Sequence, residues 1–300
     1  MNLLKYQILV LMDRYHKVTE VAQALNMKQP TVSFHMKSME KEMQTPLFHA
    51  AKGRILLTEA GRKLLPYARQ ILSLESAAMQ ALADHAGLTG KRIRIAAEII
   101  PGSYILPGPV TEYTKIKPEA YILLEIHPAD TINRLLQEGE IDFAFVHDPL
   151  LSDSITCHPV FRDEMGMITS ASRSLRLDGS SLKETLLHEA FAIASSPSFL
   201  HSFAKTWFER NSISMTSANI VLESGSLEAV KHAVSAGGMI SFFPACGIRE
   251  REEGIVWHAL PGARPAFYEI YMMHGNHPLS ESKEAFKSFI LGQTGQTMGM

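Results

Sequence analysis

The chain has 300 residues, of which 46% are hydrophobic, and its formal net charge is −2. This length and composition fit a small head joined to a globular body of two lobes, and no internal repeat or low-complexity tract stands out. The apolar start is broken by Asp13 and Arg14, unlike a signal peptide, and no apolar run approaches the roughly 20 residues that cross a membrane. The two cysteines form no disulfide framework, so we expect a cytoplasmic protein.

Charge is distributed unevenly along the chain. Residues 1–62 hold nine Lys and Arg against five Asp and Glu, a net charge of +4, which leaves −6 for the other 238 residues. A basic first segment on an acidic remainder suggests a nucleic-acid-binding module attached to another domain.

Apolar residues in the first 43 positions recur at helical intervals. They predict a first helix around Ile8 and Met12 and a shorter second helix around Val21, ended by Asn26. A third helix should start at Gln29 and Pro30, because proline at the first helical position loses no hydrogen bond. Its inward stripe is Val32, Met36, Met39 and Met43. This arrangement is a helix-turn-helix.

The outward face of the third helix carries the residues expected to meet DNA. Short hydroxyls near a helix N-terminus can bind phosphates or base edges, and lysines add a salt-dependent attraction to phosphate. Lys52-Gly53-Arg54 lies between two short apolar runs and predicts a wing tip on the phosphate backbone, with a solvated hairpin as the alternative. The predicted DNA-binding residues are Lys28, Gln29, Pro30, Thr31, Ser33, Phe34, His35, Lys37, Ser38, Lys52 and Arg54.

These residues also carry a family resemblance. The string QPTVSFHMKSMEKEMQTPLF, followed by LTEAG and LLPYARQIL, resembles the head and linker helix of the LysR-type transcriptional regulators, and the resemblance continues over nearly all 300 residues. Phe34 and His35 depart from the arginine and glutamine that the family commonly has there.

The resemblance implies an α/β fold with an N-terminal all-α winged helix-turn-helix in residues 1–58. Residues 59–90 would be a linker and dimerisation helix with a hinge. Residues 91–300 would be a two-lobed effector domain built like a periplasmic binding protein, with lobe I at about 91–161 and 267–300 and lobe II at about 162–266.

The linker carries a heptad pattern. Leu65, Leu72, Met79 and Ala86 are spaced by seven, and Ala68, Glu75 and Leu82 form the companion series. Such a seam predicts a short coiled coil that pairs two heads. Glu75 and Pro66 weaken it, so a kinked or packed surface helix is the alternative. The glycines of residues 86–90 read as a hinge.

From residue 91 onward, predicted strands alternate with helices. Strands are expected at 92–97, 121–126, 141–146, 164–169, 191–195, 219–223, 239–243 and 268–273, and helices at 104–114, 130–137, 199–211, 227–236 and 280–291. This βαβ order predicts parallel sheets whose ligands bind at the carboxyl ends of the strands, in a cleft between two lobes.

Residues after those strand ends are the predicted effector-binding residues. Hydroxyls and free backbone N–H groups at helix starts can bind anions, although helix capping alone would explain each serine. His147 is interpreted as a cleft edge or a contact between lobes. The predicted residues are Glu98, Ile99, Ile100, Gly102, Ser103, His147, Ser195, Ser196, Ser198, Ser224, Gly225 and Ser226.

Glu98 departs from the family, which often has serine or threonine there and again at Ile100. A glutamate repels anions and an isoleucine side chain donates no hydrogen bond. The hypothesis is an effector with an amine, a hydroxyl or an apolar face, not a simple dianion, whose positive group would pair with Glu98. The alternative is that Glu98 faces solvent or a basic neighbour.

Enzymatic readings are weak. The chain lacks GxGxxG, the GxxxxGK[ST] phosphate loop, HExxH and GxSxG. His274 and His277 do not make a convincing metal pair, and no cofactor or metal is expected. Two alternatives to the main interpretation stay open: a redox-sensing regulator that uses Cys157 and Cys246, and a solute-binding module whose head contacts protein instead of DNA.

The main interpretation is a bacterial, sequence-specific regulator. We expect its heads to bind an inverted-repeat operator in double-stranded DNA as a homodimer through the linker helix, and the dimers to form a homotetramer. A small-molecule effector between the lobes would control it, RNA polymerase would be a further partner, and no membrane is involved.

Overall fold

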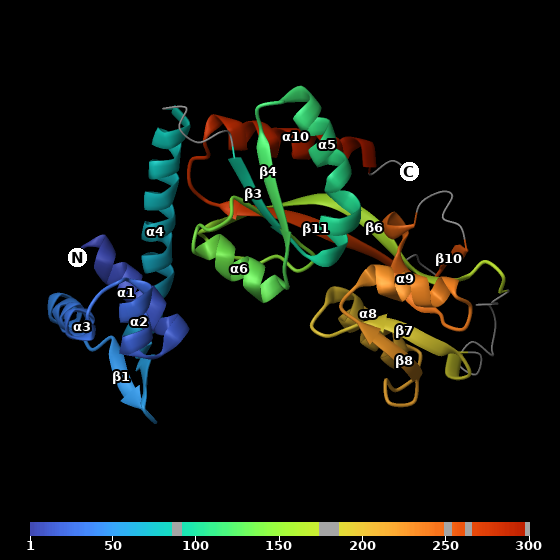
Figure 1. Cartoon of the computed structure of the whole chain (residues 1–300), viewed down its shortest axis with the longest axis horizontal. Coiled ribbons are helices and arrows are strands. Elements are labelled where there is room, and N and C mark those ends of the chain that lie inside the picture. The colour runs from blue at the N-terminus through green and yellow to red at the C-terminus, as the bar shows by residue number, and fades with distance from the viewer. Residues whose placement is uncertain (86–91, 174–185, 249–253, 262–265, 298–300) are drawn as a thin grey trace.

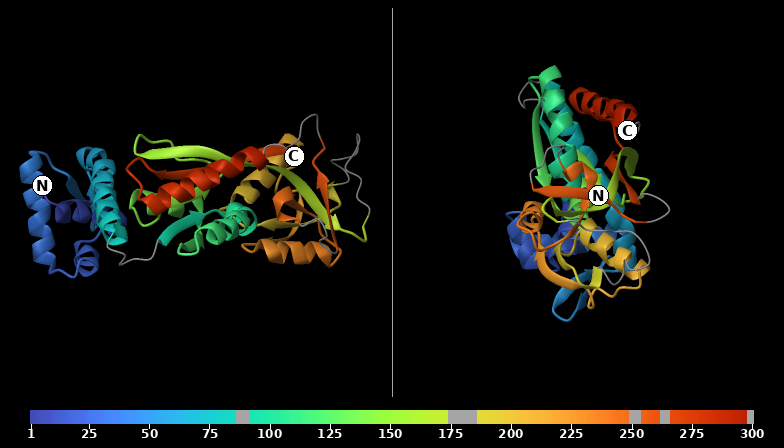
Figure 2. Two further views of the ribbon diagram at one scale, coloured as in Figure 1. Left: turned by 90° about the horizontal axis from the view of Figure 1, so that it is seen from above. Right: turned by 90° about the vertical axis from the view of Figure 1, so that its right-hand side faces the viewer.

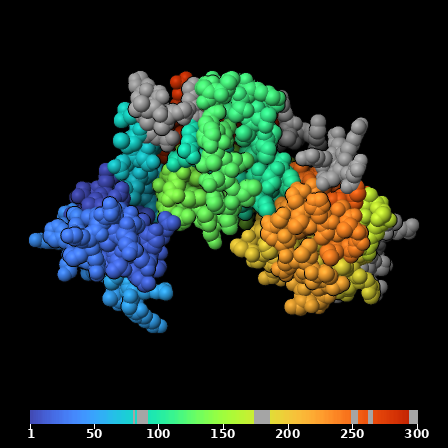
Figure 3. All heavy atoms as spheres, in the orientation of Figure 1, coloured from blue at the N-terminus to red at the C-terminus, as the bar shows by residue number. Residues whose placement is uncertain are grey.

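The computed structural model describes residues 1–85, 92–173, 186–248, 254–261 and 266–297. Figure 1 shows a small helical head, a long helix beside it and a larger α/β body. The space-filling view places the head and lobe II on opposite sides of lobe I (Figure 3). The predicted hinge at 86–90 lies outside the described residues.

The head is a winged helix-turn-helix, as predicted. Its elements are α1 (Leu3–Tyr15), α2 (Val18–Ala24), α3 (Gln29–Met43), β1 (Phe48–Ala51), β2 (Arg54–Leu57) and α4 (Glu59–His85). Helix α3 begins at Gln29 with Pro30 in its first turn, and Met39 is fully buried. The inward stripe of α3 therefore contributes to two apolar clusters, one shared with α1 and α2 and the other shared with α1 and the first half of α4.

Lobe I holds a parallel βαβ arrangement. Its elements are β3 (Arg92–Ala97), the π-helical turn η1 (Pro101–Ile105), α5 (Pro107–Ile116), β4 (Tyr121–Ile126), α6 (Ala129–Gln137), β5 (Phe143–Val146) and the C-terminal α10 (Glu281–Thr297). Strand β3 pairs in parallel with β4 and with β5. The helix predicted at 104–114 is replaced by η1 and α5, which meet at the prolines that interrupt the pattern.

Lobe II holds β7 (Ala190–Ala194), α8 (Phe199–Arg210), β8 (Asn219–Ser224), α9 (Leu227–Ser235), β9 (Ser241–Pro244), η2 (Ala245–Gly247) and β10 (Ile255–Ala259). Strands β7 and β8 form a parallel pair, and β9 and β10 join the main sheet through β6. The sequence pattern did not predict β10, which packs its Trp257 over Gly166. A Cβ at residue 166 would lie 2.3 Å from the Trp257 ring, so only glycine fits there.

Two long antiparallel strands connect the lobes. β6 (Ile155–Ser170) and β11 (Ala266–Gly275) pair along their length, and the sheet order is β10-β6-β11-β5-β3-β4. Both strands are longer than the predicted 164–169 and 268–273. Pro159 interrupts the first half of β6, because proline donates no ladder hydrogen bond, and the register shifts opposite it between Ile270 and Tyr271.

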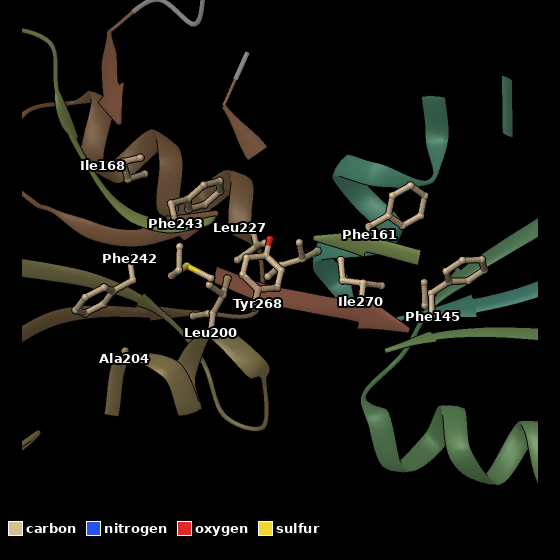
Figure 4. Packing of buried hydrophobic residues seen from close by; sticks show 14 of the residues in the cluster. Phe145, Phe161, Ile168, Leu200, Ala204, Leu227, Phe242, Phe243, Tyr268 and Ile270 are labelled. Carbon is tan, nitrogen blue, oxygen red and sulfur yellow. The ribbon is translucent and has the colours of Figure 1, made fainter. Parts of the chain in front are cut away.

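The buried core is continuous across the lobes. Figure 4 shows Phe145 and Phe161 on one side, Phe242 and Leu200 on the other, and Tyr268 of β11 between them. The left view of Figure 2 separates the head with α4 from the body along the long axis. Helix α4 lies between the head and lobe I, where it contacts both α1 and α6.

Candidate DNA interface and candidate effector cleft

Helix α3 presents its first turn and one polar face to solvent. Thr31 and Lys37 are exposed, and Phe34 between them is 67% exposed. The first turn of α3 has no side-chain cap, because Lys28 makes no cap bond; Pro30 has no N–H, and the Thr31 N–H donates to the Lys28 carbonyl at 3.0 Å. Together with the exposed Lys28 side chain, this uncapped helix N-terminus is suited to a DNA phosphate.

The predicted DNA-binding residues divide into two groups. Lys28, Gln29, Pro30, Thr31, Phe34, Lys37, Lys52 and Arg54 are exposed, whereas Ser33, His35 and Ser38 are half-buried on the flanks. Ser38 Oγ accepts a hydrogen bond from Lys5 Nζ at 2.9 Å, and Lys5 also pairs with Glu42. Ser38 is thereby tied to α1, and the free face of α3 is centred on Thr31, Phe34 and Lys37.

The wing is a tight hairpin. β1 and β2 pair up to Ala51 and Arg54, and Lys52 and Gly53 between them have φ values of 48° and 76°. Positive φ at both central residues gives a two-residue turn whose twist matches the right-handed twist of the flanking strands. The turn brings the exposed Lys52 and Arg54 to its tip. The hairpin extends from the lower end of the head in Figure 1.

The first heptad residues of α4 pack on the head of the same chain and not on a second helix. Ala68 is fully buried against the head, and Leu65 and Leu72 pack on the same core. The exposed apolar stripe is instead formed by Tyr67, Leu74, Ala78 and Leu82, with Tyr67 63%, Leu74 54% and Leu82 66% exposed. The first half of the predicted seam therefore packs on the protein's own head, whereas its later members Met79 and Leu82 are exposed, and Leu82 also belongs to the exposed stripe.

A cleft of about 180 Å³ lies at the strand ends between the lobes. Seven of the predicted effector residues line it, namely Glu98, Ile99, His147, Ser195, Ser198, Ser224 and Gly225, and they come from β3, β5, β7 and β8 or from the segments that follow these strands. The lining is completed by Ile126, His127, Pro128, Ala194, Pro197, Phe199 and Leu227. Ile126 is the last residue of β4, and His127 and Pro128 follow it, so the rule that ligands bind at the carboxyl ends of strands also applies to these three residues.

Five predicted effector residues lie outside this cleft. Ile100 and Gly102 are buried in lobe I, where a Cβ on Gly102 would lie 2.9 Å from Ile126. Ser103 and Ser196 are exposed elsewhere, and Ser226 caps α9 through a bond from the Ala229 N–H. The apolar Ile100 is therefore core packing, which explains why no hydroxyl is needed there.

Glu98 pairs with a basic neighbour. Its Oε2 accepts hydrogen bonds from the backbone N–H and from Nδ1 of His147, both at 2.7 Å. The His147 ring stacks on Phe199 of α8, with ring centroids 3.9 Å apart and an interplanar angle of 3°. This stack joins the end of β5 in lobe I to the start of α8 in lobe II.

The serines of lobe II cap helices. Ser198 Oγ accepts from the His201 N–H and donates to the Ser195 carbonyl, and Ser224 Oγ accepts from the Ser226 N–H. Capping of α8 therefore accounts for Ser198 as an acceptor, and a local bond in the turn before α9 accounts for Ser224. The N-termini of α8 and α9 nevertheless face the cleft, through Ser198, Phe199 and Leu227.

The two thiols are poorly suited to redox sensing. Burial raises the pKa of the Cys246 thiol, and the carboxylate of Asp163 adds to this effect. Burial also raises the pKa of Cys157. Since the thiolate is the reactive form, raised pKa values disfavour the redox alternative.

Other chemistries find no support within the described ranges. Among these residues, no group of three or more His, Cys, Asp or Glu is placed to hold a metal ion. None of the helices in the same ranges is long and apolar enough to cross a membrane.

Comparison with known families assigns both parts of the chain. Residues 3–62 match the bacterial regulatory helix-turn-helix protein, lysR family, and residues 86–295 match the LysR substrate binding domain. A winged head joined to such a domain defines a DNA-binding transcriptional regulator with an effector-binding domain, and not an enzyme. The chain belongs to the LysR-type transcriptional regulators.

Individual relatives agree with this assignment. A probable RuBisCO transcriptional regulator of Trichormus variabilis is 27% identical over 277 residues, which cover 91% of this chain and 82% of the relative. A full-length OxyR variant from Pseudomonas aeruginosa has a TM-score of 0.63 at 18% identity and covers 98% of this chain and 94% of its own. Full-length CbnR in complex with its target DNA has a TM-score of 0.56 at 18% identity and covers 98% and 100%. Both structures share the fold.

The exposed face of α3 gives a first prediction. Lys37→Ala should weaken binding to specific and random duplex alike and reduce the salt slope by about 1, because a lysine contacts phosphate in any sequence. Thr31→Ala or His35→Ala should instead change base preference, by roughly 1–3 kcal/mol for a base contact. Fluorescence anisotropy over a salt series measures both effects.

Lys115→Ala serves as a control, because Lys115 pairs with Glu112 on α5 in lobe I, far from the head. Equal losses on specific and random duplex for all three head variants would contradict the division of roles on α3.

Proposed function

We propose that this regulator binds an operator with paired heads and is controlled by a small molecule in the cleft of about 180 Å³. The observation that carries the proposal is the His147–Phe199 stack at 3.9 Å, which brings both lobes to the lining. A ligand that touches both lobes binds one lobe arrangement better than another, and this difference in affinity shifts the population.

Helix α6 offers the route from cleft to head. It starts after Pro128, which lines the cleft, and ends at Gln137, roughly 13 Å further on at 1.5 Å per residue. Arg69 of α4 bonds Gln137 Oε1 through Nη1 at 2.8 Å and Asp13 of α1 through Nη2 at 3.0 Å. We expect a displacement of α6 to reach α4 and α1 through this one guanidinium.

The assembly follows from the linker helix. The exposed stripe of Tyr67, Leu74, Ala78 and Leu82 fits pairing with the same helix of a second copy, since an isolated apolar stripe on a helix is stabilised by burial. The dimer would set the spacing of two half-sites on a pseudo-palindromic operator. We further propose a homotetramer that acts with RNA polymerase in the bacterial cytoplasm.

Filling the cleft tests its role as the sensor. Gly225 lines the cleft, and a Cβ there would meet only Ser195 Oγ, at 3.6 Å, so Gly225→Leu should fold and occupy the space. In a thermal-shift screen of a metabolite panel, compounds that raise the Tm of the natural chain and change its promoter affinity should do neither in this variant.

Gly238→Leu is the matched control. Gly238 is exposed and follows the C-terminal end of α9, and no atom lies within 4 Å of a Cβ placed there. Responses that persist in Gly225→Leu would place the sensor outside the cleft.

The α6 route predicts a change in DNA geometry. Arg69→Ala should alter the bend angle of promoter DNA without any added ligand, because the head loses its link to α6. Binding to a single half-site should stay unchanged, since the bonds of Arg69 go to Asp13 of α1 and Gln137 of α6. Circular-permutation gel shifts measure the bend.

Arg173→Ala removes a comparable partly buried ion pair, with Glu189 in lobe II, and should leave the bend unchanged. If Arg69→Ala, like Arg173→Ala, bends promoter DNA to the same angle as the natural chain does, the proposed route through α6 and Arg69 is refuted.

The linker stripe predicts dimer loss on charge insertion. Leu74→Glu with Leu82→Glu would bury unpaired carboxylates between two helices and should raise the dimer dissociation constant by more than about tenfold. Sedimentation velocity measures this. Ser76→Glu places the same charge two residues from Leu74, off the stripe, and should leave the dimer intact. Intact dimers in the double variant would rule out this stripe as the interface.

A further inference from the structure

The cleft has two ends of different polarity. On the lobe I side, Glu98 is the acidic group of the lining, and the described lining residues include no lysine or arginine. A ligand carboxylate on the lobe I side of the His147 ring, next to Glu98, would therefore be repelled by the Glu98 carboxylate.

His147 carries an unused atom at this end. The ring is bonded to Glu98 through Nδ1, and its side chain is only 3% exposed, yet Nε2 is buried without a hydrogen-bond partner. In the tautomer whose Nδ1–H donates to Glu98, Nε2 carries the lone pair of the imidazole and is an acceptor. A buried acceptor without a partner in the cleft lining calls for a donor from a ligand.

The lobe II side has the opposite character. The first N–H groups of α8 and α9 have no partner within their helices, and Ser198 and Ser226 satisfy only the third in each, at His201 and Ala229. Two helix N-termini that face the same cleft favour a negative group. The carboxylate of Glu228, in the first turn of α9, already accepts from the Tyr104 hydroxyl at 3.1 Å.

These two ends are close together, and the walls between them are apolar. Phe199, the first residue of α8, stacks on the His147 ring at 3.9 Å, so the free Nε2 and the α8 N-terminus belong to one corner of the cleft. Ile99, Ile126 and Leu227 supply aliphatic wall. The volume of about 180 Å³ is below the roughly 300–1,000 Å³ of sites for drug-sized ligands, so the occupant is small.

We infer that the cleft binds a small aliphatic α-amino acid as its zwitterion. The ammonium group donates to Nε2 of His147 beside Glu98, the carboxylate accepts from the N–H groups that begin α8 and α9, and the side chain lies on the aliphatic wall. Such a ligand contacts both lobes with complementary charge and favours the closed cleft. This inference rests on the proposed function, in which the cleft is the effector site.

Calorimetry of the full chain with three matched probes tests this ligand class. L-norvaline carries both charged groups, butylamine lacks its carboxylate, and pentanoate lacks its amine. Norvaline should bind at least about tenfold more tightly than either partial probe, the value of one charge-assisted hydrogen bond or more.

Two variants assign the ammonium end. His147→Phe keeps a ring on Phe199 and removes Nε2, whereas Glu98→Gln removes the charge and keeps an acceptor oxygen for Nδ1. Each variant should raise the dissociation constants of norvaline and butylamine about tenfold and leave the dissociation constant of pentanoate unchanged. The Glu98 variant keeps the assignment testable if the His147 variant does not fold.

The outcomes separate this inference from the proposed function. Pentanoate binding as tightly as norvaline, and lost in Gly225→Leu, overturns the amino acid while the cleft remains the effector site. Norvaline binding that persists in Gly225→Leu overturns both. Absence of norvaline binding overturns the inferred ligand class alone. The role of the cleft as the effector site is tested separately, by the metabolite screen with Gly225→Leu.

Discussion

The pairing of β6 with β11 is the constraint on which the body depends. The ladder runs from Met165 opposite Ala266 to Ile155 opposite Gly275, so both lobes share one sheet. Tyr268, near the start of β11, donates from its hydroxyl to Asp163 at 2.6 Å, and its ring contacts His147 and Phe199. The shared sheet thereby helps to fix the positions of these two cleft-lining rings.

Much of the head and part of the site could be predicted from the sequence, because local rules determine them. Proline in the first turn predicted the start of α3, and the methionine spacing predicted its buried face. Lys52-Gly53 predicted the turn of the wing. Strand ends gave seven lining residues of the cleft. Phe199 was missed because a residue after a helix cap has no pattern of its own, and its role depends on His147, which is distant in the chain.

Other features depend on contacts between residues that are distant in the chain, which a single sequence does not reveal. A heptad pattern shows which side chains of α4 are apolar, but Ala68 and Leu72 pack on the protein's own head and leave Leu74 and Leu82 exposed. Glu98 read alone suggests a free acidic group, whereas its partner His147 becomes visible only in the fold. Arg69 likewise joins Asp13 and Gln137, which belong to separate domains of the chain.

Hydrogen exchange of the full chain bound to duplex DNA from its own upstream region tests the DNA-reading role most directly. The account predicts that this duplex protects backbone amides at the start of α3 and in the β1–β2 turn, and that a scrambled duplex at the same salt concentration protects α3 much less. Equal protection by both duplexes, or protection confined to the body with α3 unchanged, would contradict it.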